Sequence, residues 1–252
     1  MFRISNLSVN YASHRVLENI NASLKPGSFT ALLGSNGTGK STLLKAMAGL
    51  IPAKGSFYHS DHGELTPQKR GDLVAYMPQD AGATSSLTVI EVILLGRLRS
   101  LGMRVPECLQ IEASESLASF GLKSLENRTL DEISGGQRQL VYLAQSLFRN
   151  PSILLLDEPT AALDLRHQLL VLDRVANHCH RNDTVAMAAM HDISLAAKHA
   201  DRLICLSQGN IVADGVPEDV LTEPLIRELY GVEADIIKGT NGTLHITPLR
   251  AV

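Results

Sequence analysis

The sequence contains no tryptophan, and only 4% of its 252 residues are aromatic. It has just three cysteines, which lie far apart and not in metal-ligand spacing: Cys108, Cys179 and Cys205. An odd, scattered set of thiols neither pairs completely nor forms a zinc pattern. We therefore expect a protein of a reducing cytosol, without disulfides.

Long apolar runs and an excess of positive charge are also missing. No apolar run approaches the roughly 20 residues that a membrane helix needs. Segment 1–6 lacks the basic, apolar and small-residue layout of a secretory signal. The formal net charge of −3 gives no global attraction to nucleic acid or anionic lipid. We expect a soluble chain that binds no nucleic acid and reaches a membrane only through a partner.

The most informative stretch matches the phosphate-binding loop pattern and its next residue: Gly34, Ser35, Asn36, Gly37, Thr38, Gly39, Lys40, Ser41 and Thr42. A buried strand is predicted before it, over 28–33, and a helix after it, over 40–49. The glycines allow a nest of N–H groups for phosphate oxygens, and the helix N-terminus adds positive potential. Lys40 would bind the β- and γ-phosphates, Ser41 would bind Mg²⁺, and Thr42 would donate a further hydrogen bond. The alternative is an ordinary glycine-rich turn, which these flanks disfavour.

A second apolar strand, over 152–156, ends in two acids, Asp157 and Glu158. Burying a carboxylate at such a strand end is costly unless a metal or a proton is involved. Asp157 would hold Mg²⁺, directly or through water, and Glu158 would accept the proton of an attacking water. The alternative is that these acids only cap a helix, which is also the simplest reading of Asp164.

Polar residues follow two further predicted strands. Gln79 comes after the strand 72–77, and His191 after the strand 184–190. Ligands of α/β sheets bind at the carboxyl ends of strands, so His191 could hydrogen-bond a γ-phosphate. The alternatives are a loop cap for Gln79 and a core or helix-capping histidine for His191. Tyr11, in a turn upstream, could stack on an adenine ring or be a half-buried residue at a strand end.

The segment Ser134-Gly135-Gly136-Gln137 precedes a predicted helix that runs to Arg149, and it forms another possible nest. One ATP needs one phosphate loop, whereas this chain carries two predicted anion-binding segments. A head-to-tail dimer would use both segments, because each nucleotide then lies between one chain's phosphate loop and the other chain's Ser-Gly-Gly. The alternative is a glycine C-cap plus a serine N-cap between two helices.

The predicted elements give an α/β fold, and with its phosphate loop the core resembles that of the P-loop NTPases (RecA-like). Alternation over 2–29 predicts an N-terminal antiparallel β subdomain, and helical signals dominate 84–149. The dipeptide Asn241-Gly242 favours a type I′ hairpin near the C-terminus. The single domain 1–252 would then comprise a nucleotide-binding core, an inserted helical subdomain and a C-terminal hairpin: 1–83 with 150–230, 84–149, and 231–252.

In this order the motifs resemble those of the nucleotide-binding subunits of ABC transporters, over about residues 2–220. The resemblance implies the following motifs in chain order: Tyr11 as the adenine-stacking A-loop, 34–42 as Walker A, Gln79 as the Q-loop, 134–137 as the signature, 153–158 as Walker B, 163–164 as the D-loop and His191 as the switch histidine. It further implies ATP and Mg²⁺ as cofactors, with Ser41, Gln79 and Asp157 at the metal. Lys40, Gln79, Glu158 and His191 would be catalytic, and Asp164 would join the signature residues at the nucleotide.

Two segments, 92–97 and 162–168, resemble the branch that imports iron–siderophores, haem or cobalamin. This resemblance implies an ATP-hydrolysing subunit, peripheral on the cytoplasmic face of a bacterial inner (plasma) membrane. Its partners would be a second copy of itself, an integral membrane permease and, indirectly, a substrate-binding protein. The alternative is a soluble ABC ATPase that acts as an assembly or scaffold factor, for example in iron–sulfur cluster building.

Overall fold

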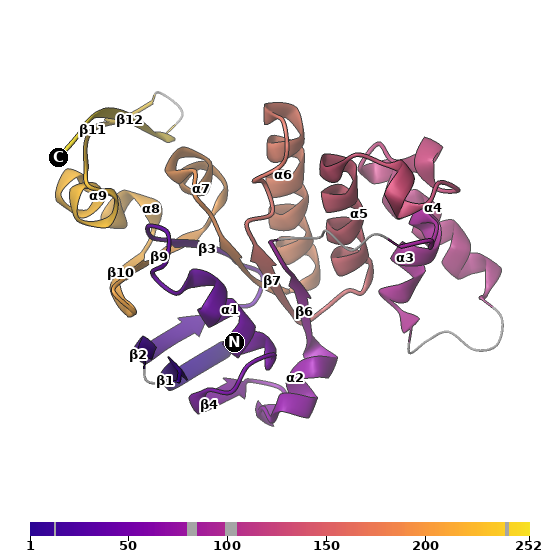
Figure 1. The fold of residues 1–252 in the computed structure, drawn as a ribbon, viewed down its shortest axis with the longest axis horizontal. Helices are drawn as coiled ribbons and strands as arrows, with labels where there is room; N and C mark the ends of the chain where they lie inside the picture. The colour runs from indigo at the N-terminus through magenta and orange to yellow at the C-terminus, as the bar shows by residue number, and fades with distance from the viewer. Residues whose placement is uncertain (13, 80–84, 99–104, 240–241) are drawn as a thin grey trace.

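The computed structural model describes residues 1–12, 14–79, 85–98, 105–239 and 242–252. The predicted start of the helical subdomain at residue 84 and Asn241 of the predicted turn lie outside the described residues. Three layers and a lateral helical part are visible in Figure 1. None of the described helices combines the length and apolar character that crossing a bilayer requires.

The central layer is a six-stranded sheet in the order β10-β9-β3-β8-β7-β6. Its strands are β3 (Phe29–Leu33), β6 (Val74–Met77), β7 (Ile153–Asp157), β8 (Val185–Ala189), β9 (Arg202–Ser207) and β10 (Asn210–Gly215). All neighbours are parallel except β10, which pairs antiparallel with β9. Every residue of β3, β7 and β8 is buried, as the unbroken apolar runs predict for strands covered on both faces.

A four-stranded sheet lies below the central one in Figure 1, in the order β2-β1-β4-β5. Its strands are β1 (Phe2–Tyr11), β2 (His14–Leu24), β4 (Lys54–His59) and β5 (Gly63–Glu64). Alternate residues of β1 are buried, among them Phe2 and Ile4. They pack with helix α1 (Lys40–Ala48) against one face of the central sheet. The predicted N-terminal antiparallel part is confirmed.

The other face of the central sheet is covered by helices α5 (Gly135–Phe148), α6 (Leu165–Asn182) and α7 (Ile193–His199). Helices α3 (Val89–Leu95) and α4 (Glu107–Ser119) pack with α5 at one end of the molecule (Figure 1). Two short 3₁₀ turns, Lys123–Leu125 and Leu130–Glu132, lead into α5. A capping box of Thr88 and Glu91 opens α3, and this helix ends at Leu95. It stops because the chain tightens into a turn in which Gly96 N–H donates to Ile93 O.

The strand predicted over 72–77 is shorter than expected. Helix α2 (Pro67–Leu73) takes up Asp72 and Leu73, and the strand begins at Val74. Thr66 caps α2 by accepting a hydrogen bond from Lys69 N–H. Pro67 occupies the first turn of the helix, where proline favours a helix start. These local signals for a helix override the apolar pattern.

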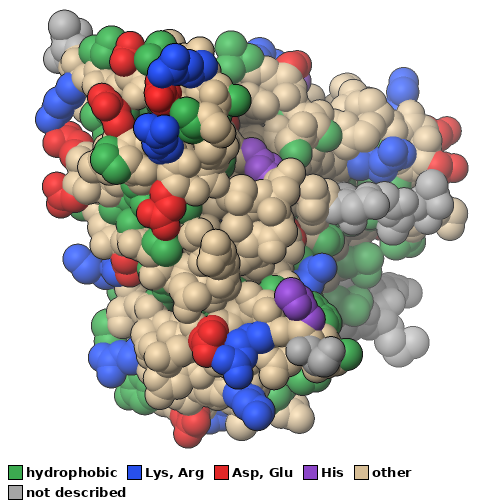
Figure 2. All heavy atoms as spheres, turned by 60° about the vertical axis from the view of Figure 1, so that its left-hand side comes forward, with side chains coloured by type: hydrophobic (Ala, Val, Ile, Leu, Met, Phe, Trp, Pro, Cys, Tyr) green, Lys and Arg blue, Asp and Glu red, His purple; other side chains and the backbone are tan. Residues whose placement is uncertain are grey.

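The C-terminal part consists of helices α8 (Pro217–Val220) and α9 (Glu223–Tyr230) and the hairpin of β11 (Val232–Lys238) with β12 (Leu244–Ala251). Strand β12 contacts α7, which places the hairpin beside the central layer. Figure 2 shows acidic and basic side chains interspersed on the face that this end presents. A mixed surface of this kind agrees with the small net charge of −3.

Candidate nucleotide-binding site

The loop between β3 and α1 has a backbone that only glycine fits at two positions. Gly34 has a φ of 149° and Gly39 a φ of 101°. A Cβ on Gly34 would lie 2.4 Å from the carbonyl oxygen of Leu206, and one on Gly39 would lie 2.8 Å from Leu17 Cδ2. Thr38 Oγ1 closes the turn by donating to Ser35 O at 2.9 Å. The loop therefore curls tightly before α1 begins, as a phosphate-binding nest requires.

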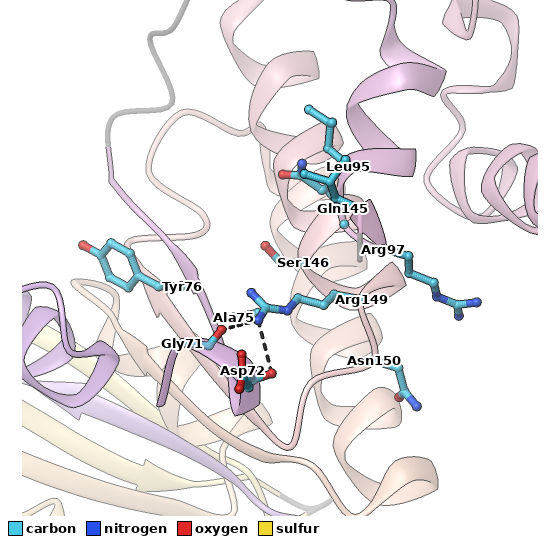
Figure 3. Close-up of a pocket in the computed structure, with 12 residues that line it drawn as sticks. Gly71, Asp72, Ala75, Tyr76, Leu95, Arg97, Gln145, Ser146, Arg149 and Asn150 are labelled. Atoms are coloured by element: carbon cyan, nitrogen blue, oxygen red, sulfur yellow. Dashed lines mark hydrogen bonds between the residues drawn. The ribbon is translucent and has the colours of Figure 1, made fainter. Parts of the chain in front are cut away.

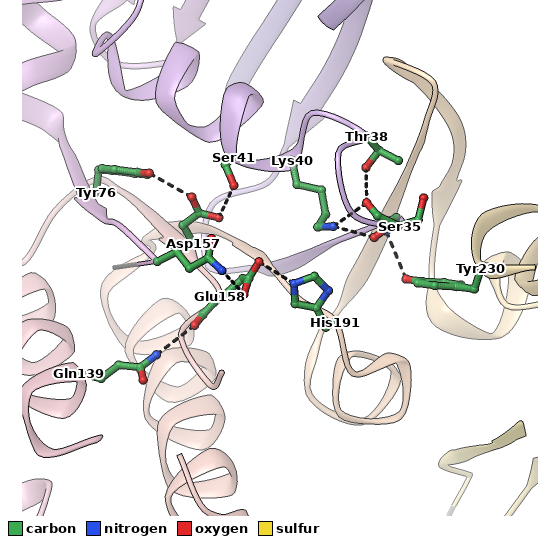
Figure 4. A network of polar contacts seen from close by, with 12 residues as sticks. Ser35, Thr38, Lys40, Ser41, Tyr76, Gln139, Asp157, Glu158, His191 and Tyr230 are labelled. Atoms are coloured by element: carbon green, nitrogen blue, oxygen red, sulfur yellow. Dashed lines mark hydrogen bonds and ion pairs between the residues drawn. The ribbon is translucent and has the colours of Figure 1, made fainter. Parts of the chain in front are cut away.

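Lys40 is the only charged side chain that this loop contributes, and the residue is 6% exposed. Its Nζ donates to Gly34 O at 2.7 Å and to Ser35 O at 3.0 Å (Figure 4). Burial lowers the pKa of Lys40, although the negative charges of Glu158 and Asp157 oppose that effect. A buried ammonium held by neutral carbonyls is poorly compensated, so the loop favours an anion.

Asp157, at the end of β7, is 2% exposed and accepts two hydrogen bonds. Ser41 Oγ donates to Oδ1 at 2.9 Å, and Tyr76 OH donates to Oδ2 at 3.1 Å. Burial raises the pKa of Asp157, while the Ser41 and Tyr76 hydrogen bonds act in the opposite sense. Burial and the negative charge of Asp157 also raise the pKa of Tyr76. The carboxylate is thus poorly hydrated, which favours a cation beside it.

Glu158, the next residue, is held at both carboxylate oxygens. Gln79 Nε2 donates to Oε2 at 2.8 Å, and His191 Nε2 lies 2.5 Å from Oε1 (Figure 4). The side chain of Glu158 is 12% exposed, and its φ of 52° is in the left-handed region. Three strand ends, those of β6, β7 and β8, therefore bring Gln79, Glu158 and His191 together, as their positions in the sequence predict.

Part of the phosphate loop and the carboxylate of Glu158 with its two partners line one pocket of 460 Å³. The predicted residues that line it are Asn36, Gly37, Gly39, Lys40, Ser41, Thr42, Gln79, Glu158 and His191. Val16 from β2 completes the lining. An anion-binding loop, a hydroxyl beside a buried carboxylate, and a second carboxylate oriented by an amide and an imidazole are suited to cleaving a phosphoanhydride with water.

A sequence model of the ABC transporter family matches residues 17–161, more than half of the chain. The chain belongs to this family. Among curated ABC relatives, it is 34% identical over 98% of its length to a cobalamin import ATP-binding protein of Halobacterium salinarum. It spans only 63% of that relative's length. It is 36% identical to a hemin import ATP-binding protein of Gloeobacter violaceus, with 94% of this chain and 90% of the relative covered.

Solved ABC structures share the fold. One described as an inward-facing, metal-chelate type ABC transporter has a TM-score of 0.82 at 24% identity, covering 99% of this chain and 97% of its own. A dimeric bacterial ABC transporter cassette has a TM-score of 0.78 at 26% identity, covering 86% of this chain and 99% of its own. The predicted ABC fold, a P-loop core with an antiparallel sheet and a helical part, is confirmed.

The residues predicted to form the ABC signature, 134–137, lie outside the phosphate-loop pocket. Ser134 Oγ accepts from Gln137 N–H at 3.2 Å, and Gln137 Oε1 accepts from Ser134 N–H at 2.9 Å, so the pair caps α5. Asp164 caps α6 by accepting from His167 N–H at 2.9 Å. Ser134, Gly136, Gln137 and Asp164 line a second pocket of 640 Å³, which shares no lining residue with the first. Gly135 sits between these signature residues at the start of α5.

Tyr11 lies at the end of β1, is 48% exposed, and is not among the residues that line the phosphate-loop pocket. Strand β2, which pairs with β1, does contribute Val16 to that pocket. Tyr11 thus lies half-buried at a strand end, as the alternative describes, and its stacking on an adenine ring stays a prediction.

Sequence reasoning missed three residues that contact the candidate site: Tyr76, Gln139 and Tyr230. Tyr76 could have been found, since it belongs to the strand that ends just before Gln79. Gln139 is a polar residue at a buried position of the signature helix, and its Nε2 donates to Glu158 O at 3.0 Å. Tyr230 OH accepts from Gly34 N–H at 3.2 Å, and burial raises the pKa of Tyr230 to about 12. No local signal marks Tyr230, because it lies 196 residues after Gly34 in the sequence.

Proposed function

We propose that this chain is the ATP-hydrolysing subunit of an ABC importer that powers the uptake of a metal chelate. The observation that carries the proposal is one pocket lined by Lys40, Ser41 and Glu158, with the buried Asp157 hydrogen-bonded to Ser41 behind it. The chelate class rests on the relatives, which include ATP-binding proteins for import of cobalamin and hemin. A ferric enterobactin transport ATP-binding protein of Escherichia coli is 32% identical over 98% of the chain.

ATP would bind with its phosphates in the loop 34–42 and its adenine on the exposed ring of Tyr11. Backbone N–H groups of the loop and the start of α1 would face the phosphate oxygens. The Lys40 ammonium would exchange its two carbonyl acceptors for the β- and γ-phosphate oxygens. That exchange is favourable because a charged acceptor compensates a buried ammonium better than carbonyls do.

Ser41 and Asp157 fit the requirements of Mg²⁺. Mg²⁺ usually takes one or two carboxylates or hydroxyls from the protein and keeps phosphate and water oxygens as its other ligands. The Ser41 Oγ and the Asp157 carboxylate are already adjacent, at 2.9 Å, and the Gln79 side chain lies at the same pocket. When bound, Mg²⁺ would supply charge neutralisation at the β- and γ-phosphates.

For hydrolysis, Glu158 would accept a proton from the attacking water. The water oxygen would bond to the γ-phosphorus as the bond from the γ-phosphorus to the ADP oxygen breaks and ADP leaves. Gln79 and His191 fix the carboxylate in place before the water arrives. His191 would also hydrogen-bond the γ-phosphate, and Lys40 would stabilise the charge that develops on its oxygens.

The signature residues, Ser134 to Gln137, and Asp164 would contact the nucleotide of a second copy. Within one chain Ser134, Gly136, Gln137 and Asp164 line a pocket that shares no residue with the phosphate-loop pocket, so we place them at the partner's nucleotide and not at their own. A head-to-tail dimer gives each nucleotide one loop and one signature. The likeness to a solved dimeric cassette supports this arrangement.

An integral membrane permease would dock in the groove between the core and the helical part. This groove has a volume of 810 Å³ and runs between the end of α2, β6, α3 and α5 (Figure 3). Arg149 closes one wall by donating to Gly71 O at 2.6 Å and to Asp72 O at 3.2 Å. Leu95 and Leu98 line the groove and are 39% and 58% exposed, whereas most of its other lining side chains are polar, so an amphipathic helix would fit there.

Gln79 follows β6, one wall of this groove, and also holds Glu158. A movement of the groove caused by the permease would therefore move the carboxylate of Glu158, the proposed base. The chain would be peripheral on the cytoplasmic face of the inner membrane, with a substrate-binding protein acting through the permease.

The direct test of the enzymatic part is phosphate release from ATP by the purified chain, with Mg²⁺ and with excess chelator. We expect release only with Mg²⁺, and no release in either condition would contradict the proposal.

A further inference from the structure

Gln139 is a buried amide on the signature helix α5, with 5% of its surface exposed. Its Nε2 donates to the carbonyl oxygen of Glu158 at 3.0 Å (Figure 4). Its Oε1 is buried and has no hydrogen-bond partner among the described residues. An unpaired buried acceptor lowers stability, so an apolar side chain of equal size would serve packing better. The amide is therefore explained by its contact with Glu158 and not by the stability of the core.

The main chain of Glu158 is held from three sides. Its N–H donates to Ala189 O at 3.2 Å, and its carbonyl accepts from Ala161 N–H at 3.3 Å as well as from Gln139. With φ at 52°, the residue has a backbone conformation that few side chains adopt without such support. Because the backbone sets the direction of the side chain, a shift of Gln139 changes where the Glu158 carboxylate points.

The first turn of α5 lies along the segment that follows Glu158. Gly136 and Gln139 are three residues apart and so share one face of the helix. A Cβ on Gly136 would lie 3.2 Å from Ala162 O, while Gln139 reaches Glu158 O. Ser134 caps the same turn. A ligand that moves this turn therefore moves the support of Glu158 with it.

We propose that Gln139 couples the two nucleotide sites of the dimer. The proposal rests on the head-to-tail arrangement under the proposed function. A nucleotide on one chain's phosphate loop contacts the partner's signature, whose α5 carries Gln139. That Gln139 supports the Glu158 of its own chain, which acts on the other nucleotide. Gln139 is a positioning residue, and through it the occupancy of one site sets the orientation of the base at the other.

The test compares the ATP dependence of hydrolysis in the full-length chain with that of Gln139→Met. Methionine keeps the length and volume of glutamine and removes the donor. We expect the wild type to be cooperative, with a Hill coefficient above 1, and the variant to fall to about 1. We expect kcat to drop about three- to tenfold, the worth of one hydrogen bond, with unchanged equilibrium ATP binding and an unchanged or higher melting temperature.

Thr184→Val is the matched control. Thr184 is 1% exposed, and its Oγ1 donates to Pro151 O at 2.9 Å, just before β7, the strand that ends in Asp157 and Glu158. The control also removes a buried donor to a main-chain carbonyl, but at the opposite end of β7, so its Hill coefficient should match the wild type. Gln139→Asn keeps the amide on a shorter side chain, so the amide no longer reaches Glu158 O. This variant should lose cooperativity as Gln139→Met does.

The outcomes separate the two proposals. If the wild type hydrolyses ATP and either Gln139 variant keeps its Hill coefficient and kcat, the coupling role is wrong while the proposed function stands. A wild type that hydrolyses ATP without cooperativity also overturns the coupling role. If the wild type does not hydrolyse ATP at all, both proposals are wrong.

Discussion

Ser41 and Asp157 are 116 residues apart in the chain, and Ser41 Oγ donates to Asp157 Oδ1 at 2.9 Å. Helix α1 contacts β7, and this packing brings the start of the helix to the end of the strand. A hydroxyl and a buried carboxylate are thereby placed beside the Lys40 ammonium. The proposed phosphate and metal contacts meet at this junction, and the predictions below test them.

Lys40→Ala should weaken ATP binding about 10- to 100-fold, because hydrogen bonds to a charged group contribute about 1.5–3 kcal/mol. The loop then loses its only charged side chain at the phosphates. Equilibrium binding of ATP measures the effect, and Lys54→Ala, at an exposed position of β4, is the control. Equal affinities for the wild type and Lys40→Ala would rule out this loop as the phosphate site.

Glu158→Gln should keep ATP binding and slow hydrolysis by about 10²–10⁴-fold, the usual contribution of a general base. The amide retains the shape of the side chain but cannot accept the proton. Since the ATP-bound dimer would then persist, the variant should elute as a dimer with ATP in light-scattering chromatography. A fully active variant that stays monomeric would contradict both the base role and the dimer.

Ser134→Arg should abolish hydrolysis although Ser134 lies outside the phosphate-loop pocket. Mixing this variant with Lys40→Ala chains should partly restore activity, because in a mixed dimer one composite site carries both changes and the other carries neither. Phosphate release from the mixture is compared with release from each variant alone. No recovery, with mixed dimers verified, would count against the head-to-tail arrangement.

Asp157→Asn should raise the melting temperature of the nucleotide-free chain while abolishing Mg²⁺-dependent hydrolysis. Burial raises the pKa of Asp157, so its ionised form destabilises the fold above that pKa, and the penalty is lost as pH falls. A gain of about 2–4 °C corresponds to about 1 kcal/mol for a chain of this size.

The difference from the wild type should be full at pH 7 and should shrink as the pH is lowered towards the raised pKa. Thermal melts at several pH values measure it. The exposed Asp235 provides the control Asp235→Asn, which should change the melting temperature little at any pH. A lower melting temperature for Asp157→Asn at pH 7 would show that the charged form stabilises the fold.

Much of this fold could be predicted from local patterns. Unbroken apolar runs identify buried parallel strands such as β3 and β7, and glycines with an adjacent Lys40 identify the loop between strand and helix. The order of the motifs indicated the ABC family, to which the chain does belong. Polar residues just after strands, Gln79 and His191, were placed correctly at one edge of the sheet, since parallel strands share that edge.

Other features depend on packing that no local pattern records. Tyr230 reaches Gly34 only because α9 folds back onto the loop, and Gln139 reaches Glu158 because α5 lies along the segment after β7. The late start of β6 shows the same limit, since the Thr66 cap and Pro67 start a helix that runs on to Leu73. The roles of the site residues stay predictions until the variants above are measured.

Reconstitution in liposomes tests the central claim most directly. The chain is combined with the permease encoded beside it in the genome and with the substrate-binding protein, loaded in turn with iron–siderophore, haem and cobalamin. We predict ATP-dependent uptake of one of these chelates. Lys40→Ala should abolish this uptake. Gln79→Ala should reduce the uptake more than it reduces ATP binding. Chelate uptake that proceeds equally without ATP or without this chain would contradict the claim. Uptake only of an unrelated solute, such as a sugar, would contradict the substrate class alone.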